Sequence, residues 1–160
     1  MNKLINNIKI LELITRAVET LWRRDSELIK REVHEECINH RFAIYLEKEF
    51  QNIMMKEGLS LDIEYNKNGI NPKTYGSKDK KFRPDIIIHE RNSNSNNYVV
   101  IEAKKNRLSK SDKEKLINCK LEPYNYKVAL GIEYGVGKDY FNLYIYESNG
   151  SNQKIKINKT

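Results

Sequence analysis

The chain has 160 residues, of which 39% are hydrophobic and 32% charged, and its formal net charge is +7 at pH 7. This composition supports one hydrophobic core and excludes a disordered chain, and no apolar stretch approaches the roughly 20 residues of a membrane helix. The positive charge favours a polyanionic partner, above all nucleic acid, although a lysine- and asparagine-rich sequence from an AT-rich genome would be basic without any such function.

The N-terminal part of the chain predicts two helices. Apolar residues recur at three- and four-residue steps from about residue 3 to 22, which is typical of an amphipathic helix and not of a signal peptide. The pattern breaks near Arg24-Asp25-Ser26, and a second helix is expected from there to Lys56, ending before Gly58. On a helical projection, the core-facing stripe of this second helix comprises Leu28, Phe42, Leu46, Phe50 and Ile53.

Two glutamates, Glu32 and Glu35, fall on that apolar stripe. A carboxylate that faces the core is costly unless it has a partner. Either Glu35 reaches water at the edge of the stripe, or it lies over a functional site in the sheet. Glu36 is turned roughly 100° away around the helix and is the weaker candidate.

The remainder of the chain predicts strands and one more helix. Residues 59–66 alternate between apolar and polar and indicate a strand, whereas the lysine-rich segment 67–82 indicates an exposed basic loop. Strands follow at Pro84–Glu90 and Tyr98–Lys104, then a helix with a capping box of Ser111 and Glu114, and then three strands in YKVALGIEY, YFNLYIYES and QKIKIN. This order predicts one α/β domain over residues 1–160, a mixed sheet flanked by helices.

Residues 84–104 predict a hairpin with two acidic residues. If its turn is centred on the polar tract RNSNSNN, then Asp85 lies opposite Glu102, and His89 lies opposite Tyr98. Directly opposed side chains have Cβ atoms about 4.5–5.5 Å apart, so two carboxylates there need a cation between them. The separation suits Mg²⁺, which prefers oxygen ligands. A register slipped by two residues would separate the pair, and the alternative to a metal site is that both acids lie harmlessly at strand ends.

Alternation along the second strand of this hairpin places Glu102 and Lys104 on one face, with Ile101 and Ala103 facing the core. The Lys104 ammonium could orient or help to deprotonate a metal-bound water, or offset charge on a phosphate. The carbonyl oxygen of Ala103 could supply a further metal ligand. The strand therefore presents a metal ligand and an ammonium side by side.

Three features of the sequence together resemble the motifs of the PD-(D/E)XK nuclease superfamily, which has the restriction-endonuclease-like fold. They are Pro84-Asp85, Glu102-Ala103-Lys104 and the helix acid Glu35. The resemblance covers residues 28–134 and leaves the helix at 3–22 as an addition. Blocks such as EECINHRFAIYLE and DIEYN look like those of small bacterial proteins of this superfamily. That likeness also points to Glu64-Tyr65-Asn66, whose role the sequence does not define.

The resemblance implies a metal-dependent nuclease. Asp85, Glu102 and the Ala103 carbonyl would hold Mg²⁺ (or Mn²⁺), Glu35 would bind through water or hold a second metal, and Lys104 would orient the attacking water. The substrate would be nucleic acid, DNA in preference to RNA. The loop cations would follow its phosphate backbone, although an ordinary solvated loop explains them equally well; they are Lys73, Lys78, Lys80, Lys81 and Arg83.

An alternative hypothesis keeps the fold and removes the catalysis. The chain would then be a nucleic-acid-binding or protein-interaction module, a subunit of a defence or mobile-element complex, and the charged residues of the hairpin would form a structural ion cluster. A homodimer or a partner protein fits either hypothesis. Cys37 and Cys119 have no metal-ligand spacing around them, so we expect reduced thiols, no zinc site and a cytoplasmic location.

Overall fold

The structure is a computed structural model that describes residues 2–160, with side chains described from residue 7 onward. Within these residues the helices are α1 (Asn2–Lys30), α2 (Glu35–Glu57) and α3 (Lys110–Cys119). The six-stranded sheet comprises β1 (Ser60–Ile63), β6 (Ile86–His89), β7 (Asn97–Lys104), β8 (Val128–Glu133), β9 (Tyr140–Tyr146) and β10 (Asn152–Asn158). The predicted α/β class is confirmed, and none of the described helices is long and apolar enough to cross a membrane.

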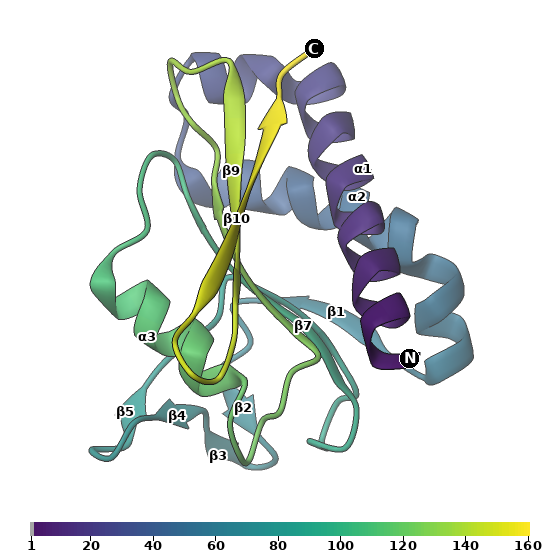
Figure 1. Cartoon of the computed structure of the whole chain (residues 1–160), viewed down its shortest axis with the longest axis vertical. Coiled ribbons are helices and arrows are strands. Elements are labelled where there is room, and N and C mark those ends of the chain that lie inside the picture. Colours follow the sequence, from purple (N-terminus) through teal and green to yellow (C-terminus); the bar gives the residue numbers. More distant parts are fainter. Residues whose placement is uncertain (1) are drawn as a thin grey trace.

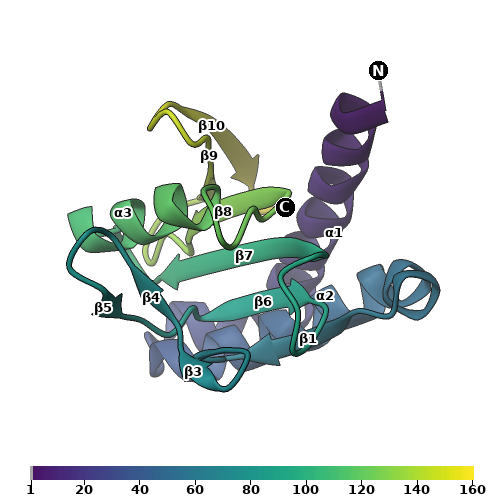
Figure 2. The same cartoon turned by 90° about the horizontal axis from the view of Figure 1, so that it is seen from below.

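The large sheet has the strand order β1-β6-β7-β8-β9-β10 (Figures 1 and 2). All neighbouring strands are antiparallel except β7 and β8, which are parallel. Parallel neighbours need a long crossover connection, and α3 lies in the segment that joins these two strands. The sheet is therefore mixed, as the sequence predicts.

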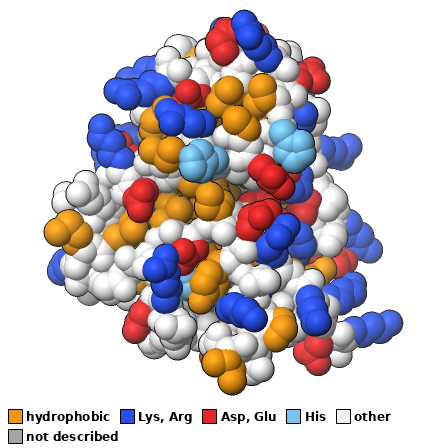
Figure 3. Space-filling view, turned by 180° about the vertical axis from the view of Figure 1, so that it is seen from behind, with side chains coloured by type: hydrophobic (Ala, Val, Ile, Leu, Met, Phe, Trp, Pro, Cys, Tyr) orange, Lys and Arg blue, Asp and Glu red, His pale blue; other side chains and the backbone are white. Residues whose placement is uncertain are grey.

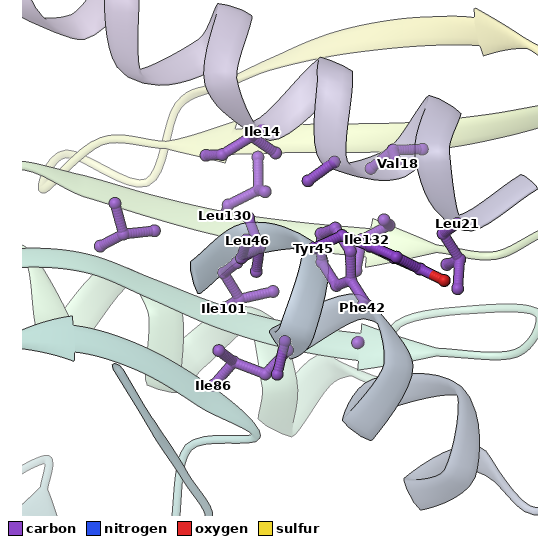
Figure 4. Packing of buried hydrophobic residues seen from close by; sticks show 14 of the residues in the cluster. Ile14, Val18, Leu21, Phe42, Tyr45, Leu46, Ile86, Ile101, Leu130 and Ile132 are labelled. Carbon is purple, nitrogen blue, oxygen red and sulfur yellow. The ribbon is translucent and has the colours of Figure 1, made fainter. Parts of the chain in front are cut away.

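Both faces of the sheet are covered. On one face, alternate strand residues such as Ile101 and Leu130 pack against Phe42 and Leu46 of α2 and against Ile14 of α1 (Figure 4). On the other face the intervening strand residues pack against α3; this cluster includes Val100, Ala129, Leu116 and Cys119. Seven of the eight residues of β7 are buried as a result. A strand enclosed on both sides reads as a continuous apolar run, which makes its single glutamate unusual.

The boundary between the first two helices differs from the prediction. The expected break coincides with a kink in α1 at Asp25, whose backbone is non-helical (φ −132°, ψ 24°), but the helix continues to Lys30. The true turn follows at Glu32, which adopts a positive φ of 52°, and α2 begins only at Glu35. No glycine or proline signals this turn in the sequence. Leu28 consequently lies on α1 and not on the stripe of α2, whereas the predicted end at Gly58 is confirmed.

The predicted hairpin register is confirmed in its middle. Ile86 lies opposite Ile101, and Ile87 lies opposite Val100. The register then shifts at a β-bulge, so that His89 lies opposite Asn97 and not opposite Tyr98. A bulge inserts one extra residue into one strand without changing the hydrophobic pattern at its start, and here the extra residue is Tyr98.

The segment predicted as an exposed basic loop instead forms two small hairpins, β2–β3 (Lys67–Asn68 and Asn71–Pro72) and β4–β5 (Thr74–Tyr75 and Lys80–Lys81). Lys73, predicted among the exposed cations, is only 1% exposed. Its Nζ lies 4.8 Å from the ring centroid of Tyr124 and about 6 Å from those of Tyr65 and Tyr126. This aromatic cage compensates the buried ammonium by cation–π attraction.

The start of α3 also differs from the prediction. The N-cap is Ser109, whose hydroxyl accepts a hydrogen bond from the Asp112 backbone N–H at 3.1 Å, while the Asp112 carboxylate accepts from the Ser109 N–H at 2.9 Å. The predicted pair, Ser111 and Glu114, has the same spacing two residues later. Asp112 is buried and Ser111 is exposed, so packing against the sheet selects the earlier capping box.

We expect Leu46→Ala to lower the free energy of unfolding by about 2–5 kcal/mol, because it removes a fully buried side chain between α2 and the sheet. Met55→Ala is the matched control on the same helix, since Met55 is 77% exposed and its loss should change stability by about 0.5 kcal/mol or less. Urea unfolding of both variants measures the difference. Equal losses in the two variants would contradict the described core.

Candidate functional site

The four residues predicted to carry the chemistry meet where β6 begins and β7 ends. The Lys104 ammonium lies 3.0 Å from Glu35 Oε1 and 3.5 Å from Asp85 Oδ2. Glu35 comes from the first turn of α2, and Asp85 immediately precedes β6. The ammonium therefore connects a helix residue to a sheet residue 50 positions later in the chain.

Asp85 is positioned by a hydrogen bond to the backbone of the neighbouring strand. Its Oδ2 accepts from the Ala103 N–H at 2.7 Å. Strand β6 begins at Ile86, which pairs with Ile101, so no residue of β6 lies opposite Ala103. The Asp85 side chain therefore satisfies the backbone N–H of Ala103. Because the N–H and C=O of one strand residue point to the same side, the Ala103 carbonyl lies on the edge of β7 that Asp85 occupies.

Glu102 lies on the face of β7 that α3 covers, and it is 1% exposed. Its Oε2 is 3.3 Å from Lys115 Nζ, which in turn lies 3.2 Å from Asp112 Oδ1. Its other oxygen, Oε1, is buried and has no hydrogen-bond partner. Burial, and secondly the charge of Asp85, raise the pKa of Glu102 to about 8.

The pKa shifts of Asp85 and Lys104 indicate their protonation states. Burial raises the pKa of Asp85, although its hydrogen bond from Ala103 and the charge of Lys104 act in the opposite direction. Burial alone would lower the pKa of Lys104, but the carboxylates of Asp85 and Glu35 outweigh it and the pKa is raised. Lys104 is therefore an ammonium at neutral pH, which can donate hydrogen bonds but cannot accept a proton.

Both oxygens of Glu35 have partners: Oε1 accepts from Lys104 Nζ, and Oε2 accepts from the Lys105 backbone N–H at 3.0 Å. Glu35 thus finds the compensation that its sequence position requires, and it also lies favourably at the positive end of the α2 dipole. Glu32 does not share this role. It lies in the turn before α2, where its carbonyl accepts from Lys105 Nζ at 3.1 Å.

A pocket of about 270 Å³ lies beside Asp85, lined by Glu36, Asn39, Ile63, Glu64 and Asp85. The Oδ1 atom of Asn39 accepts from the Tyr134 hydroxyl at 2.7 Å. Glu64, which the sequence singled out without a role, forms an ion pair with Arg83 at 3.1 Å. Figure 3 shows the side of the molecule on which α2 lies, where acidic and basic side chains surround apolar ones.

No group of three or more His, Cys, Asp or Glu side chains within residues 2–160 is arranged to hold a metal ion. The predicted ligand set does not need such a group, because its third ligand is the Ala103 carbonyl. Two observations fit a divalent cation: the unpartnered buried Oε1 of Glu102, and the raised pKa of Glu102, which burial and secondly the charge of Asp85 cause. Oxygen donors of this kind suit Mg²⁺ or Mn²⁺. Glu35 fits a direct ligand less well, because both its oxygens are engaged.

The predicted nucleic-acid contacts Lys78, Lys80 and Lys81 are exposed on the β4–β5 hairpin. This hairpin is anchored to the side of the sheet where α3 lies, through a Tyr75 hydroxyl to Ser111 Oγ contact of 3.2 Å. Arg83 is also exposed, although it pairs with Glu64. The hairpin that carries these three lysines thus contacts α3, the helix that covers Glu102.

Sequence reasoning missed Lys115, the partner of Glu102 on α3, and Asp112, which pairs with the same lysine. A signal for them exists. The apolar residues Leu116 and Cys119 mark the buried side of this short helix. Asp112 and Lys115 lie four residues before Leu116 and Cys119, respectively, so these two charged residues share that side. A lysine on that side predicts a carboxylate in the sheet below it.

The chain matches no family model, no curated protein and no solved structure. Any role for these residues is therefore proposed from their geometry and from the motifs in the sequence.

We expect the stability of the protein to fall as the pH rises from about 5 to 8.5. In this range Glu102 keeps its proton in the folded state, where its pKa is about 8. In the unfolded state its pKa has the ordinary value of 4.5, so the proton has been released. Each pH unit then costs at most about 1.4 kcal/mol. Glu102→Gln should flatten this decline and unfold at higher urea concentration than the wild type at pH 8.5. Parallel pH profiles for the two proteins would show that Glu102 titrates normally.

Proposed function

We propose that the chain is a metal-dependent nuclease of the PD-(D/E)XK superfamily, with the restriction-endonuclease-like fold, that hydrolyses phosphodiester bonds in DNA in preference to RNA. The observation that carries this proposal is the buried Oε1 of Glu102, which lacks a donor in a site that also contains Asp85. A buried oxygen without a partner costs about 1–3 kcal/mol, and more when charged. A cation bound by both carboxylates would remove that cost.

Asp85, Glu102 and the Ala103 carbonyl would hold Mg²⁺ (or Mn²⁺). Such an ion supplies charge stabilisation on the phosphate oxygens and acidifies bound water. Lys104, held as an ammonium by Asp85 and Glu35, would donate a hydrogen bond that orients the attacking water or binds a phosphate oxygen, and would not act as the base. Glu35 would position Lys104. The role of Glu35 as a ligand would then be indirect, through water.

Substrate binding would use the exposed cations of the β4–β5 hairpin together with Arg83. Lys78, Lys80 and Lys81 lie on the side of the sheet that carries Glu102. Ammonium groups spaced along a hairpin bind a phosphate backbone without reading its sequence. This placement supports nucleic acid as the substrate over a small phosphate ester.

A second candidate function is a non-catalytic binding module on the same fold. It is favoured by the two lysines that already neutralise the acids, because Lys104 pairs with Glu35 and Asp85 while Lys115 pairs with Glu102 and Asp112. A structural ion cluster of this kind needs no divalent cation. Metal binding therefore discriminates between the two candidates.

We expect Mg²⁺ or Mn²⁺ to raise the Tm of the wild type, and to raise it more at pH 8.5 than at pH 6.5. The reason is that the metal competes with the proton that Glu102 binds with a pKa of about 8. Glu102→Gln should abolish the shift, whereas Glu12→Gln, which changes an exposed acid on α1, should retain it. Thermal unfolding at several metal concentrations measures this. An equal shift in Glu102→Gln would place the metal elsewhere.

We expect purified protein to cut DNA in Mg²⁺ or Mn²⁺ and not in EDTA. Glu102→Gln and Lys104→Met should each lower the cleavage rate by a factor of about 100 or more, since each removes a group that acts on the transition state. Lys9→Met, an exposed change on α1, is the control for the removal of a lysine. Plasmid, linear duplex and single-stranded DNA and RNA identify the substrate.

Two results would count against the nuclease. Cleavage that persists unchanged in Glu102→Gln and Lys104→Met would come from a contaminant. Nucleic-acid binding without cleavage, equal in wild type and both variants, would support the non-catalytic module.

A further inference from the structure

A second group of basic residues surrounds a pocket of about 590 Å³ between α1 and α2. Arg23 and Arg24 line it from α1, and Arg41 and Lys48 line it from α2. Arg41 is turned roughly 140° around the α2 axis from Glu36, which lines the pocket beside Asp85. The basic pocket is therefore separate from the candidate catalytic site.

The guanidinium of Arg41 is held in a fixed orientation at this pocket. Its Nε donates to Asp25 Oδ2 at 3.0 Å, and its Nη2 donates to the Tyr45 hydroxyl at 2.8 Å. The Tyr45 hydroxyl also donates to Asp25, which lies at the kink of α1. Among the described residues Nη1 of Arg41 has no hydrogen-bond partner. The kink thus orients an arginine whose third nitrogen remains available to a ligand.

Arg23 donates to the Thr20 hydroxyl at 3.2 Å, and the two remaining cations of the pocket form no ion pair with any described acid. Within the described part of the chain, Arg24 and Lys48 have neither a hydrogen bond nor an ion pair, and both are exposed. The one glutamate of the lining, Glu49, is engaged by Arg16 at 2.9 Å. Clustered like charges concentrate a positive potential in a concave site, which attracts an anion.

We propose that the pocket between α1 and α2 binds the phosphate group of a nucleotide, either as a free nucleotide or as one unit of a nucleic-acid strand. Arginine binds phosphate oxygens by strong charge-assisted hydrogen bonds, and the immobilised Arg41 offers its free Nη1 for such a contact. The volume is in the range of small-ligand sites and exceeds what one phosphate needs. Ile44, 39% exposed at the rim, offers apolar contact to a sugar or base. The proposal does not depend on cleavage at Asp85 and Glu102.

The test compares two double variants that remove the same charge from the same two helices. Arg24→Gln/Lys48→Gln changes the pocket, and Lys9→Gln/Lys56→Gln changes exposed lysines outside it. Binding is measured in EDTA by fluorescence anisotropy with a labelled duplex, a labelled single strand and a labelled mononucleotide, with unlabelled inorganic phosphate as a competitor. Thermal unfolding checks that both variants remain folded, which is expected because all four side chains are exposed.

The pocket variant should bind at least tenfold more weakly than the control variant. For a duplex, the slope of log K against log salt should fall by about 0.9 relative to wild type, since the pocket binds one phosphate and each lost phosphate contact removes about 0.9. Loss confined to the oligonucleotides identifies a strand as the ligand, and loss with the mononucleotide identifies a free nucleotide. The proposal would be overturned if both double variants weakened binding equally. It would also be overturned if the pocket variant bound every probe as the control variant does. Absence of cleavage would bear only on the proposed nuclease.

Discussion

The Lys104 ammonium joins three parts of the fold that the sequence keeps far apart. It pairs with Glu35 at the start of α2 and with Asp85 before β6, and it extends from the end of β7. Without it each carboxylate would keep only its backbone hydrogen bond, and without them the ammonium would be a partly buried charge with no partner. The pocket beside Asp85 is lined by residues of α2 and β1 together with Glu64 and Asp85, so the ion cluster holds Asp85 in place at one wall of the candidate site.

The parts of this arrangement that depend on periodicity could be predicted from the sequence. The alternation of apolar residues and the polar tract between the strands define the register of Ile86 with Ile101, and hence the neighbourhood of Asp85 and Glu102. The stripe on α2 likewise identifies Glu35 as a carboxylate that needs a partner. Both inferences use side-chain direction, which the 2.0 and 3.6 residue periods determine.

The parts that depend on local backbone conformation or on contacts between distant elements could not be predicted. The turn before α2 uses a glutamate with positive φ, at Glu32, where glycine or asparagine would be expected. The bulge at Tyr98 leaves the hydrophobic pattern unchanged. Lys115 compensates Glu102 across a helix–sheet interface; helical spacing places the lysine on the buried side of α3 but does not identify Glu102 as its partner. Tertiary packing decides these features, so a single sequence specifies them only weakly.

Lys73 holds the two small hairpins to the rest of the protein by a charge in an aromatic cage, where most segments of this size would use an apolar side chain. Acylation of its amine would remove that charge and with it the attraction to Tyr124. The amine is enclosed while the hairpins are docked, so an acylating reagent reaches it only when they detach. The rate of Lys73 acylation, relative to that of exposed Lys78, thus reports how often this segment opens.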